Sequence, residues 1–456
     1  MKKRLFTIAL ISASVLSLNV SCSDDFVERE FYQNVEQAPL TNLQELQAFV
    51  RGAYASMRAS TYYGADFLAY GEVRSDNMYS NLAGGYYQNV QNYTMLSTDG
   101  YASGTWNQIY TMVAKTNIAI NSDVESFSGT ELDKSKSRFT QGQAYALRAQ
   151  GFFDLLRLYG QKYTGGNLGI VLPTVYDPKA KMPRATIAET EAQIEADFNK
   201  ALQLMSSNST TLAAGNKTEL NIPSLKALMS RFYLYKGDYA KVRQLTNEIV
   251  AAGGYQVIPS GLLNVSFAYT MNGAAPNSMF ELAVGQVSSL GTTSYGYRLN
   301  PSGYANIQVK TGKVNALYQA NDLRRSLINA NNFITGKYAN ISGNDNIKVI
   351  RFEEVLLNGI EAELNGGDAA KALAYYNQII TQRGLTAATS VSLDDLKAER
   401  ARELIGEGFR QWDLLRWGDK SFKPAGKADE LLAFPIPRAE ININGTLIVP
   451  NPGYEL

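Results

Sequence analysis

The sequence predicts a mainly α-helical protein, in which four helical hairpins build a superhelical scaffold that carries a loop-rich, weakly β region. Apolar residues recur at three- and four-residue spacing in several long segments, as amphipathic helices require. One pattern of turn and helix cap occurs twice at matching offsets, which is typical of a hairpin repeat. Tyrosine, glycine and asparagine are concentrated elsewhere, in two segments with little helical periodicity.

The segment Arg351–Gly384 predicts two antiparallel helices joined by a tight turn. Gly366 can end the first helix because glycine readily takes a left-handed backbone, and the Asp368 carboxylate can cap the second. The same pattern occurs earlier in the chain, beginning at Gly237 and Asp238. In both copies an Asn lies nine residues after the Asp and an Ile lies eleven residues after it. One hairpin cannot bury both of its apolar stripes, so the hairpins are expected to stack as tetratricopeptide repeats do. Chance similarity between two amphipathic helix pairs is the alternative.

The N-terminus predicts a secretory signal peptide over residues 1–21, because basic residues precede the apolar run Leu5–Leu18. The run is shorter than a typical membrane span. Cys22 is the only cysteine, and its position resembles the lipidated cysteine of bacterial lipoproteins, although Asn19 stands where that pattern has Leu. A cleaved signal with an incidental cysteine is the alternative. Residues 22–40 are polar and are expected to form a tether.

Charge and composition exclude several classes of function. Cleavage before Cys22 removes three of the 43 basic residues, which leaves 40 against 42 acidic residues and a formal charge of −2. This chain has no basic surplus to neutralise phosphates, so nucleic acid is not expected as a partner. The sequence contains no histidine, which removes His-dependent triads and the usual zinc ligands. No phosphate-binding glycine loop is found, and we expect neither a cofactor nor a metal.

A single domain is expected over residues 22–456. Its four hairpins are expected at about 43–121, 139–205, 222–252 and 351–384. The first pairs Leu43–Arg58 with Trp106–Asn121. The second pairs Phe139–Tyr159 with Thr186–Met205, whose start is marked by a capping box.

Beyond the hairpins, one more helix is expected at Leu393–Trp417, with Ser392 as its cap. An extended tail is expected at Phe434–Leu456. Short strands are expected at Tyr255–Pro259 and Met279–Val284.

Two loop-rich segments, at about 61–104 and 253–347, hold the candidate ligand contacts. Tyrosine combines a flat apolar face with a hydroxyl, so it suits half-wetted contact surfaces, and long loops rich in aromatic residues are typical of functional segments. For any single tyrosine the alternative is a ring that pins the loop to the helices. The candidate ligand-binding residues are Asp76, Asn77, Tyr79, Tyr86, Tyr87, Asn89, Asn92, Tyr101, Tyr269, Tyr295 and Tyr297.

Several long motifs resemble those of one family, the SusD/RagB-like outer-membrane nutrient-uptake lipoproteins of Bacteroidetes. Glu399–Gly418 is similar to the family's ER-x-x-EL-x-x-EG-x-R-x-x-DLLRWG signature. Arg351–Glu363 resembles its R-x-x-EVLL helix, and Ala146–Gly160 resembles its LRA helix that ends in YG. The closing motifs are matched by Phe434–Pro437 and Asn451–Tyr454.

The resemblance implies a lipoprotein anchored to the outer membrane through Cys22 and facing the cell exterior. Asp24 and Asp25 behind it resemble the export signal of such surface lipoproteins. Family members hold oligosaccharide or peptide for import through a SusC-like TonB-dependent transporter, and the composition does not separate these two ligands. A protein-interaction scaffold that binds no small ligand is another alternative. A cell-surface glycoside hydrolase would need two converging carboxylates, and we expect no enzyme. The Arg and Glu residues of Glu399–Trp417 are expected to pair with one another.

Overall fold

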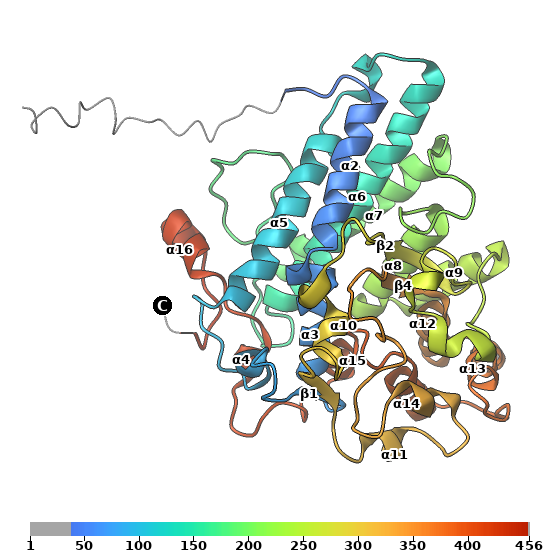
Figure 1. Cartoon of the computed structure of the whole chain (residues 1–456). Coiled ribbons are helices and arrows are strands. Elements are labelled where there is room, and N and C mark those ends of the chain that lie inside the picture. The colour runs from blue at the N-terminus through green and yellow to red at the C-terminus, as the bar shows by residue number, and fades with distance from the viewer. Residues whose placement is uncertain (1–37, 455–456) are drawn as a thin grey trace, which may run out of the picture. The chain divides into compact units, whose positions relative to one another are not determined.

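Helices account for most of residues 38–454, the part of the chain that the computed structural model describes (Figure 1). The residues from Leu40 onward form one compact unit. The expected signal peptide, the lipidation site Cys22 and nearly all of the expected tether lie outside the described residues.

Four helical hairpins form the scaffold, which confirms the predicted fold class. Each hairpin packs against the next, through contacts of α5 with α6, α7 with α8, and α9 with α12. The paired helices are α2 (Leu43–Met57) with α5 (Gly100–Ile120), α6 (Glu131–Tyr159) with α7 (Ile187–Ser207), α8 (Ile222–Lys236) with α9 (Tyr239–Ala252), and α12 (Phe352–Leu364) with α13 (Ala369–Thr381).

The predicted turn chemistry is present in both copies of the repeat. Gly237 has a positive φ of 78°, and the side chain of Asp238 accepts a hydrogen bond from the backbone N–H of Lys241. In the last hairpin, Asp368 accepts from two backbone N–H groups at the start of α13. The Tyr375 hydroxyl donates to the Asn247 amide oxygen over 2.9 Å, which joins these two hairpins. The repeat is therefore structural rather than a chance similarity.

The helix α6 is the centre of the first two hairpins and is buried on nearly all sides from Phe139 onward. Its Arg148 forms a two-point ion pair with Asp197 of α7, at 2.7 and 2.8 Å, and donates to Asn117 of α5. A buried charge is tolerated where it is paired and hydrogen-bonded. One guanidinium thus ties three helices together.

Two small antiparallel sheets lie in the irregular part of the molecule. The strand β1 (Met78–Ser80) pairs with β3 (Ile307–Val309), and β2 (Ser278–Leu282) pairs with β4 (Ile347–Arg351). Short helices accompany the strands in this part, namely α4 (Gln88–Gln91), α10 (Tyr295–Leu299) and α11 (Lys313–Leu317).

The segment 61–104 is not the continuous loop that the sequence predicts. It contains a π-helical turn at Ser60–Gly64 and the helix α3 (Asp66–Val73), in which every residue from Phe67 to Val73 is buried. A helix that is enclosed on all sides has no polar face, so it leaves no amphipathic signal in the sequence.

The predicted helix Leu393–Trp417 is broken into α14 (Leu393–Glu403) and α15 (Arg410–Arg416). Gly406 and Gly408 lie between them with φ values of 79° and 83°. This left-handed backbone interrupts a helix and is readily taken only by glycine. The predicted Ser392 cap of α14 is present as part of a capping box.

Two further expectations about the irregular part are wrong. The first is the strand expected at Tyr255–Pro259, which does not form. The other expected strand, Met279–Val284, is present as β2. The predicted extended tail contains the helix α16 (Arg438–Asn444), which begins directly after Pro437. Proline is compatible with the start of a helix, because the first backbone N–H groups need no partner there.

Candidate functional site

The β1–β3 pairing brings the two tyrosine-rich segments together. Tyr79 lies opposite Gln308 in the ladder, and its hydroxyl donates to the Gln308 side chain over 3.0 Å. The side chain of Asn306 accepts from the backbone N–H of Tyr86 and donates to Ser80 Oγ. These bonds fix the backbone of the first segment against the second.

Three half-buried rings meet where the segments join, and we call Tyr86, Tyr297 and Tyr304 the tyrosine surface. The ring centroids of Tyr86 and Tyr304 lie 5.1 Å apart, and those of Tyr297 and Tyr304 lie 4.8 Å apart. The Arg298 guanidinium lies 3.5 Å from the centre of the Tyr86 ring and 5.1 Å from the centre of the Tyr304 ring. A cation stacked on an aromatic face holds that ring in place.

A buried layer supports the tyrosine surface. The Tyr87 ring is fully buried, packs 5.1 Å from the Tyr101 ring, and donates its hydroxyl to Asp66 over 2.7 Å. Burial raises the pKa of Asp66 to about 6, although the Tyr87 hydroxyl and the Arg298 charge oppose that rise. Asp66 is therefore a structural acceptor beneath the surface.

Three of the candidate ligand residues are buried, which corrects the expectation for them. Asn77 is 1% exposed, Tyr87 0% and Tyr295 3%, so no ligand can reach their side chains in this structure. The count of tyrosines in a loop does not reveal which rings turn inward, because tyrosine serves equally well in a core and at a wet surface.

Other candidates are committed to contacts within the protein. Asp76 forms a two-point ion pair with Arg410 and a second ion pair with Lys313. Burial opposes the charge on Asp76, but these two cations lower its pKa to about 2. The Asn89 side chain donates to Asp99 at the start of α5, which fixes the loop rather than leaving its amide free.

The remaining candidates differ in position. Tyr79, Tyr86, Tyr101 and Tyr297 are partly exposed around the β1–β3 ladder, and Asn92 is exposed after α4. Tyr269 is 42% exposed and lies in a different loop. That loop is held by Asn272, whose side chain donates to the Asn344 carbonyl oxygen and accepts from the Asn346 N–H. The structure therefore brings together part of the predicted set.

Sequence reasoning missed Arg298 as a member of the site. Tyr304 was also absent from the candidate residues, although it lies in the same tyrosine-rich segment as Tyr297 and could have been chosen on composition. The stacking of Arg298 on Tyr86 joins residues 212 positions apart, and no local pattern encodes such a contact.

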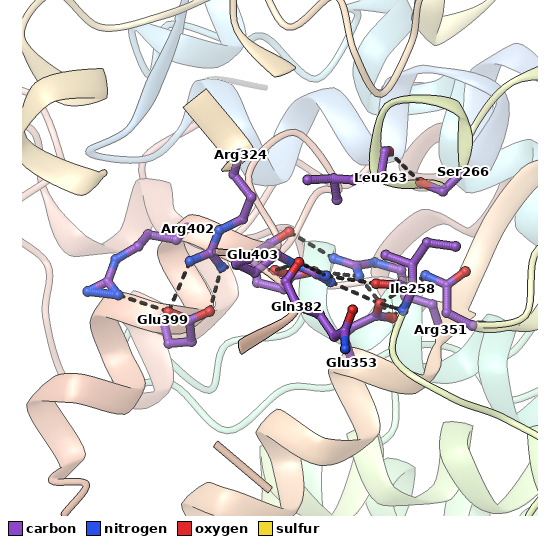
Figure 2. Close-up of polar contacts among 12 residues, drawn as sticks. Ile258, Leu263, Ser266, Arg324, Arg351, Glu353, Gln382, Glu399, Arg402 and Glu403 are labelled. Carbon is purple, nitrogen blue, oxygen red and sulfur yellow. Dashed lines mark hydrogen bonds and ion pairs between the residues drawn. The ribbon is translucent and has the colours of Figure 1, made fainter. Parts of the chain in front are cut away.

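Acidic residues of the signature Glu399–Gly418 belong to a buried network of ion pairs and do not form a ligand site (Figure 2). Arg324 binds both Glu399 and Glu403, at 2.5 and 2.9 Å, and Arg351 binds Glu403 at 2.8 Å. The cavity beside this network has a volume of about 10 Å³, too small for a nutrient. The expected pairing within Glu399–Trp417 is confirmed for Arg402 and Glu399, at 2.8 Å. Glu403 and Glu407 instead bind Arg351, which lies outside that segment. In residues 38–454 we find no cluster of ligating side chains that could hold a metal ion.

Comparison with known proteins agrees with this architecture. A family model described as "Starch-binding associating with outer membrane" matches residues 25–234, and the model of the SusD family matches residues 324–432. The chain belongs to the SusD/RagB-like family. This SusD-like protein is 23% identical to SusD-like protein P2 of Formosa agariphila, with 90% of this chain and 92% of that protein covered.

Solved structures show the same fold. A SusD superfamily protein from Bacteroides thetaiotaomicron is 26% identical, with a TM-score of 0.79 over 90% of this SusD-like protein and 100% of that chain. Surface glycan-binding protein A from the same species, solved in complex with laminarihexaose, is 18% identical, with a TM-score of 0.73 over 90% and 99% of the two chains.

The first family model associates its members with the outer membrane. Between residues 38 and 454, no helix of this SusD-like protein has both the length and the apolar character needed to cross a membrane.

Proposed function

We propose that this SusD-like protein captures oligosaccharide on the tyrosine surface and delivers it to a SusC-like TonB-dependent transporter of the outer membrane. The observation that carries the proposal is the cluster of three half-buried rings, two of which lie beside the Arg298 guanidinium. Sugar rings present flat C–H faces that can stack on aromatic rings, while their hydroxyls need polar partners. The laminarihexaose complex of the relative with the same fold adds support.

Polar groups for sugar hydroxyls are available next to the rings. Gln308 and Asn81 are partly exposed at the ladder, where their side chains are bonded to each other over 2.7 Å. The Gln308 amide oxygen already accepts from both Tyr79 and Asn81. The Asn81 amide oxygen accepts one bond, from the Ala83 N–H, so it can accept a ligand hydroxyl as well.

We further propose that binding is not followed by hydrolysis. A glycosidase needs one carboxyl that is protonated at working pH and a second carboxylate across the substrate. Asp76 is tied to two cations with a pKa of about 2, so it cannot act as the acid. Asp66 has a raised pKa, but it is half-buried and its carboxylate is bound by the Tyr87 hydroxyl, so it is committed to a contact within the protein.

Lipid anchoring at Cys22, with the protein facing the cell exterior, completes the proposal. A single acyl chain gives only marginal membrane binding, so a stable anchor needs a second acyl chain or another membrane-binding signal. Mass spectrometry of the protein extracted from membranes tests this part, because a Cys22→Ser variant should lose both the added acyl mass and the membrane association. Co-purification of a TonB-dependent transporter with the anchored protein tests the partner.

Isothermal titration of the purified chain with neutral hexasaccharides of different linkage, laminarihexaose included, tests the ligand. We expect at least one to bind and Tyr304→Ala to weaken it about tenfold, through the loss of one stacking contact. The control is Tyr269→Ala, an exposed tyrosine of another loop, which should leave the affinity unchanged. Binding of a peptide library with no response to any hexasaccharide would instead assign this protein to peptide capture.

A further inference from the structure

A groove with a volume of about 480 Å³ lies apart from the tyrosine surface, along the helix α5. Its other two sides are formed by residues of the segment 171–182 and by Glu440 and Ile448 of the C-terminal region. Figure 1 shows this segment, in green, and the red helix α16 on the same side of α5. The volume lies within the range of about 300–1,000 Å³ that is typical of ligand pockets.

The groove is held in shape by hydrogen bonds between α5 and the segment that faces it. The Tyr110 hydroxyl donates to the carbonyl oxygen of Val171 over 2.8 Å, and the Asn117 amide donates to that of Pro173 over 2.9 Å. One turn further along, Asn121 donates to the carbonyl oxygen of Thr174 over 2.9 Å. These three bonds hold the segment against α5, so the groove exists before any ligand arrives.

Aromatic side chains line both sides of the groove. On α5 the half-buried Tyr110 ring forms the wall, and the buried Trp106 ring supports it from behind with its centroid 4.8 Å away. On the facing segment, Tyr176 is 41% exposed, although tyrosine rings gain free energy from burial. The exposed ring is thus available to cover one face of a bound molecule.

The charged groups of the groove are all of one sign. Asp177 and Glu440 are among the lining residues, and no Lys or Arg is among them. Burial raises the pKa of Glu440. Carboxyl and amide oxygens accept hydrogen bonds from hydroxyl groups, while an anionic ligand would meet two acidic side chains in the lining. The lining therefore favours a neutral, hydroxyl-rich ligand with flat apolar faces.

We propose that this α5 groove is a second oligosaccharide-binding site, separate from the tyrosine surface. The ligand class rests on the proposed function, but the site does not depend on the tyrosine surface being correct. One glycan chain held at two places on the same protein stays bound longer, because the second contact forms at a high effective concentration.

Titration with the same neutral hexasaccharides tests the α5 groove, with variants chosen at exposed positions so that folding is preserved. Thr111→Trp fills the groove from α5, and Tyr176→Ala removes the facing ring; both residues are exposed. We expect two classes of site in the wild type. Thr111→Trp should abolish one class, Tyr176→Ala should weaken that class about tenfold, and Tyr304→Ala should affect only the other. Unchanged thermal unfolding of each variant confirms its fold.

The outcomes separate the two proposals. A single class of site that neither groove variant changes overturns the α5 groove and leaves the tyrosine surface standing. A single class that Thr111→Trp abolishes, and that Tyr304→Ala leaves intact, retains the groove and overturns the tyrosine surface. No binding by any hexasaccharide overturns both. Binding of tetralysine that Thr111→Trp abolishes, with no glycan bound there, assigns the groove to a cationic ligand and overturns the saccharide assignment.

Discussion

Arg383 and Glu403 lie face to face in the protein interior, with their side chains joined by two hydrogen bonds of 2.8 and 2.9 Å. Arg383 follows α13 and Glu403 ends α14, so this pair joins the last hairpin to the signature motif. Arg351 and Arg324 bind the same carboxylate. Burial opposes the charge on Glu403, but the three arginines hold its pKa well below its ordinary value.

The first prediction concerns this shared carboxylate. Glu403→Leu leaves three buried guanidinium groups short of a partner, so we expect a loss of roughly 3–5 kcal/mol in the free energy of unfolding. Urea denaturation followed by circular dichroism measures it. Lys397→Met is the control, because it removes an exposed ion pair with Asp394 and should cost about 1 kcal/mol or less. Equal losses in the two variants would contradict the role given to Glu403.

The second prediction concerns the close contact between α3 and the turn before α15. A Cβ atom added at Gly71 would overlap the backbone carbonyl of Gly408, which cannot move aside as a side chain can. We expect Gly71→Ala to destabilise the protein by about 1–3 kcal/mol, as overpacking does. Gly52→Ala on α2 is the matched control, since its Cβ would meet only Lys115 at 3.6 Å. That variant should gain about 0.5–1 kcal/mol from helix propensity. Thermal unfolding of both variants decides the point.

The third prediction concerns pH and the buried carboxyl of Glu72. Burial raises its pKa from the ordinary 4.5 to about 7, although the N–H groups of Gly408 and Phe409 donate to it. Between these values the folded protein keeps a proton that the unfolded chain has lost. The Glu72 contribution to stability is therefore complete below pH 4.5 and falls by roughly 3 kcal/mol as the pH rises to 7.

Glu72→Gln should remove that loss. The stability of the variant relative to wild type should rise between pH 5 and pH 8, as measured by urea denaturation at both values. Glu131→Gln, at an exposed position of α6, is the control and should leave the pH dependence as it is in the wild type. A constant difference between Glu72→Gln and wild type at both pH values would show that Glu72 is ionised in the folded protein.

The fourth prediction concerns the cation beneath the tyrosine surface. Arg298→Met keeps much of the side-chain volume but removes the guanidinium that stacks on Tyr86. The lost cation–π interaction is worth about 0.5–2 kcal/mol, and the Tyr86 ring loses its fixed orientation. We expect the glycan affinity to fall by about threefold to tenfold, measured by isothermal titration.

Arg138→Met is the control for this effect, because it removes an arginine that pairs with Glu125 on the exposed face of α6. An affinity that is unchanged in Arg298→Met would limit Arg298 to a structural role.

The scaffold was predictable because its signals are local. The apolar stripes of the hairpins and the caps at Asp368 and Thr186 are encoded within a few residues, and the structure contains them as expected. The enclosed helix α3 and the break before α15 were not predictable in the same way. The first has no polar face, and the second depends on Gly408 lying against Gly71, more than 300 positions away.

The candidate site was predictable in composition and not in geometry. Both tyrosine-rich segments were identified, but the pairing of Met78–Ser80 with Ile307–Val309 sets which rings meet. Strands of three residues carry too little alternation to reveal their register. The inward turn of Tyr87 depends on the half-buried Asp66 as acceptor, a partner 21 positions away that no local pattern indicates.

The β1–β3 ladder has a consequence for biosynthesis. Its two strands are separated by more than 220 residues. Closing so long a loop costs conformational entropy. Only contacts that form once both strands have been synthesised can offset that cost. Helices up to α9 are complete in sequence before β3 has been synthesised. A chain synthesised only as far as α9 can therefore form the first three hairpins, whereas the tyrosine surface cannot form until Tyr304 and β3 have followed.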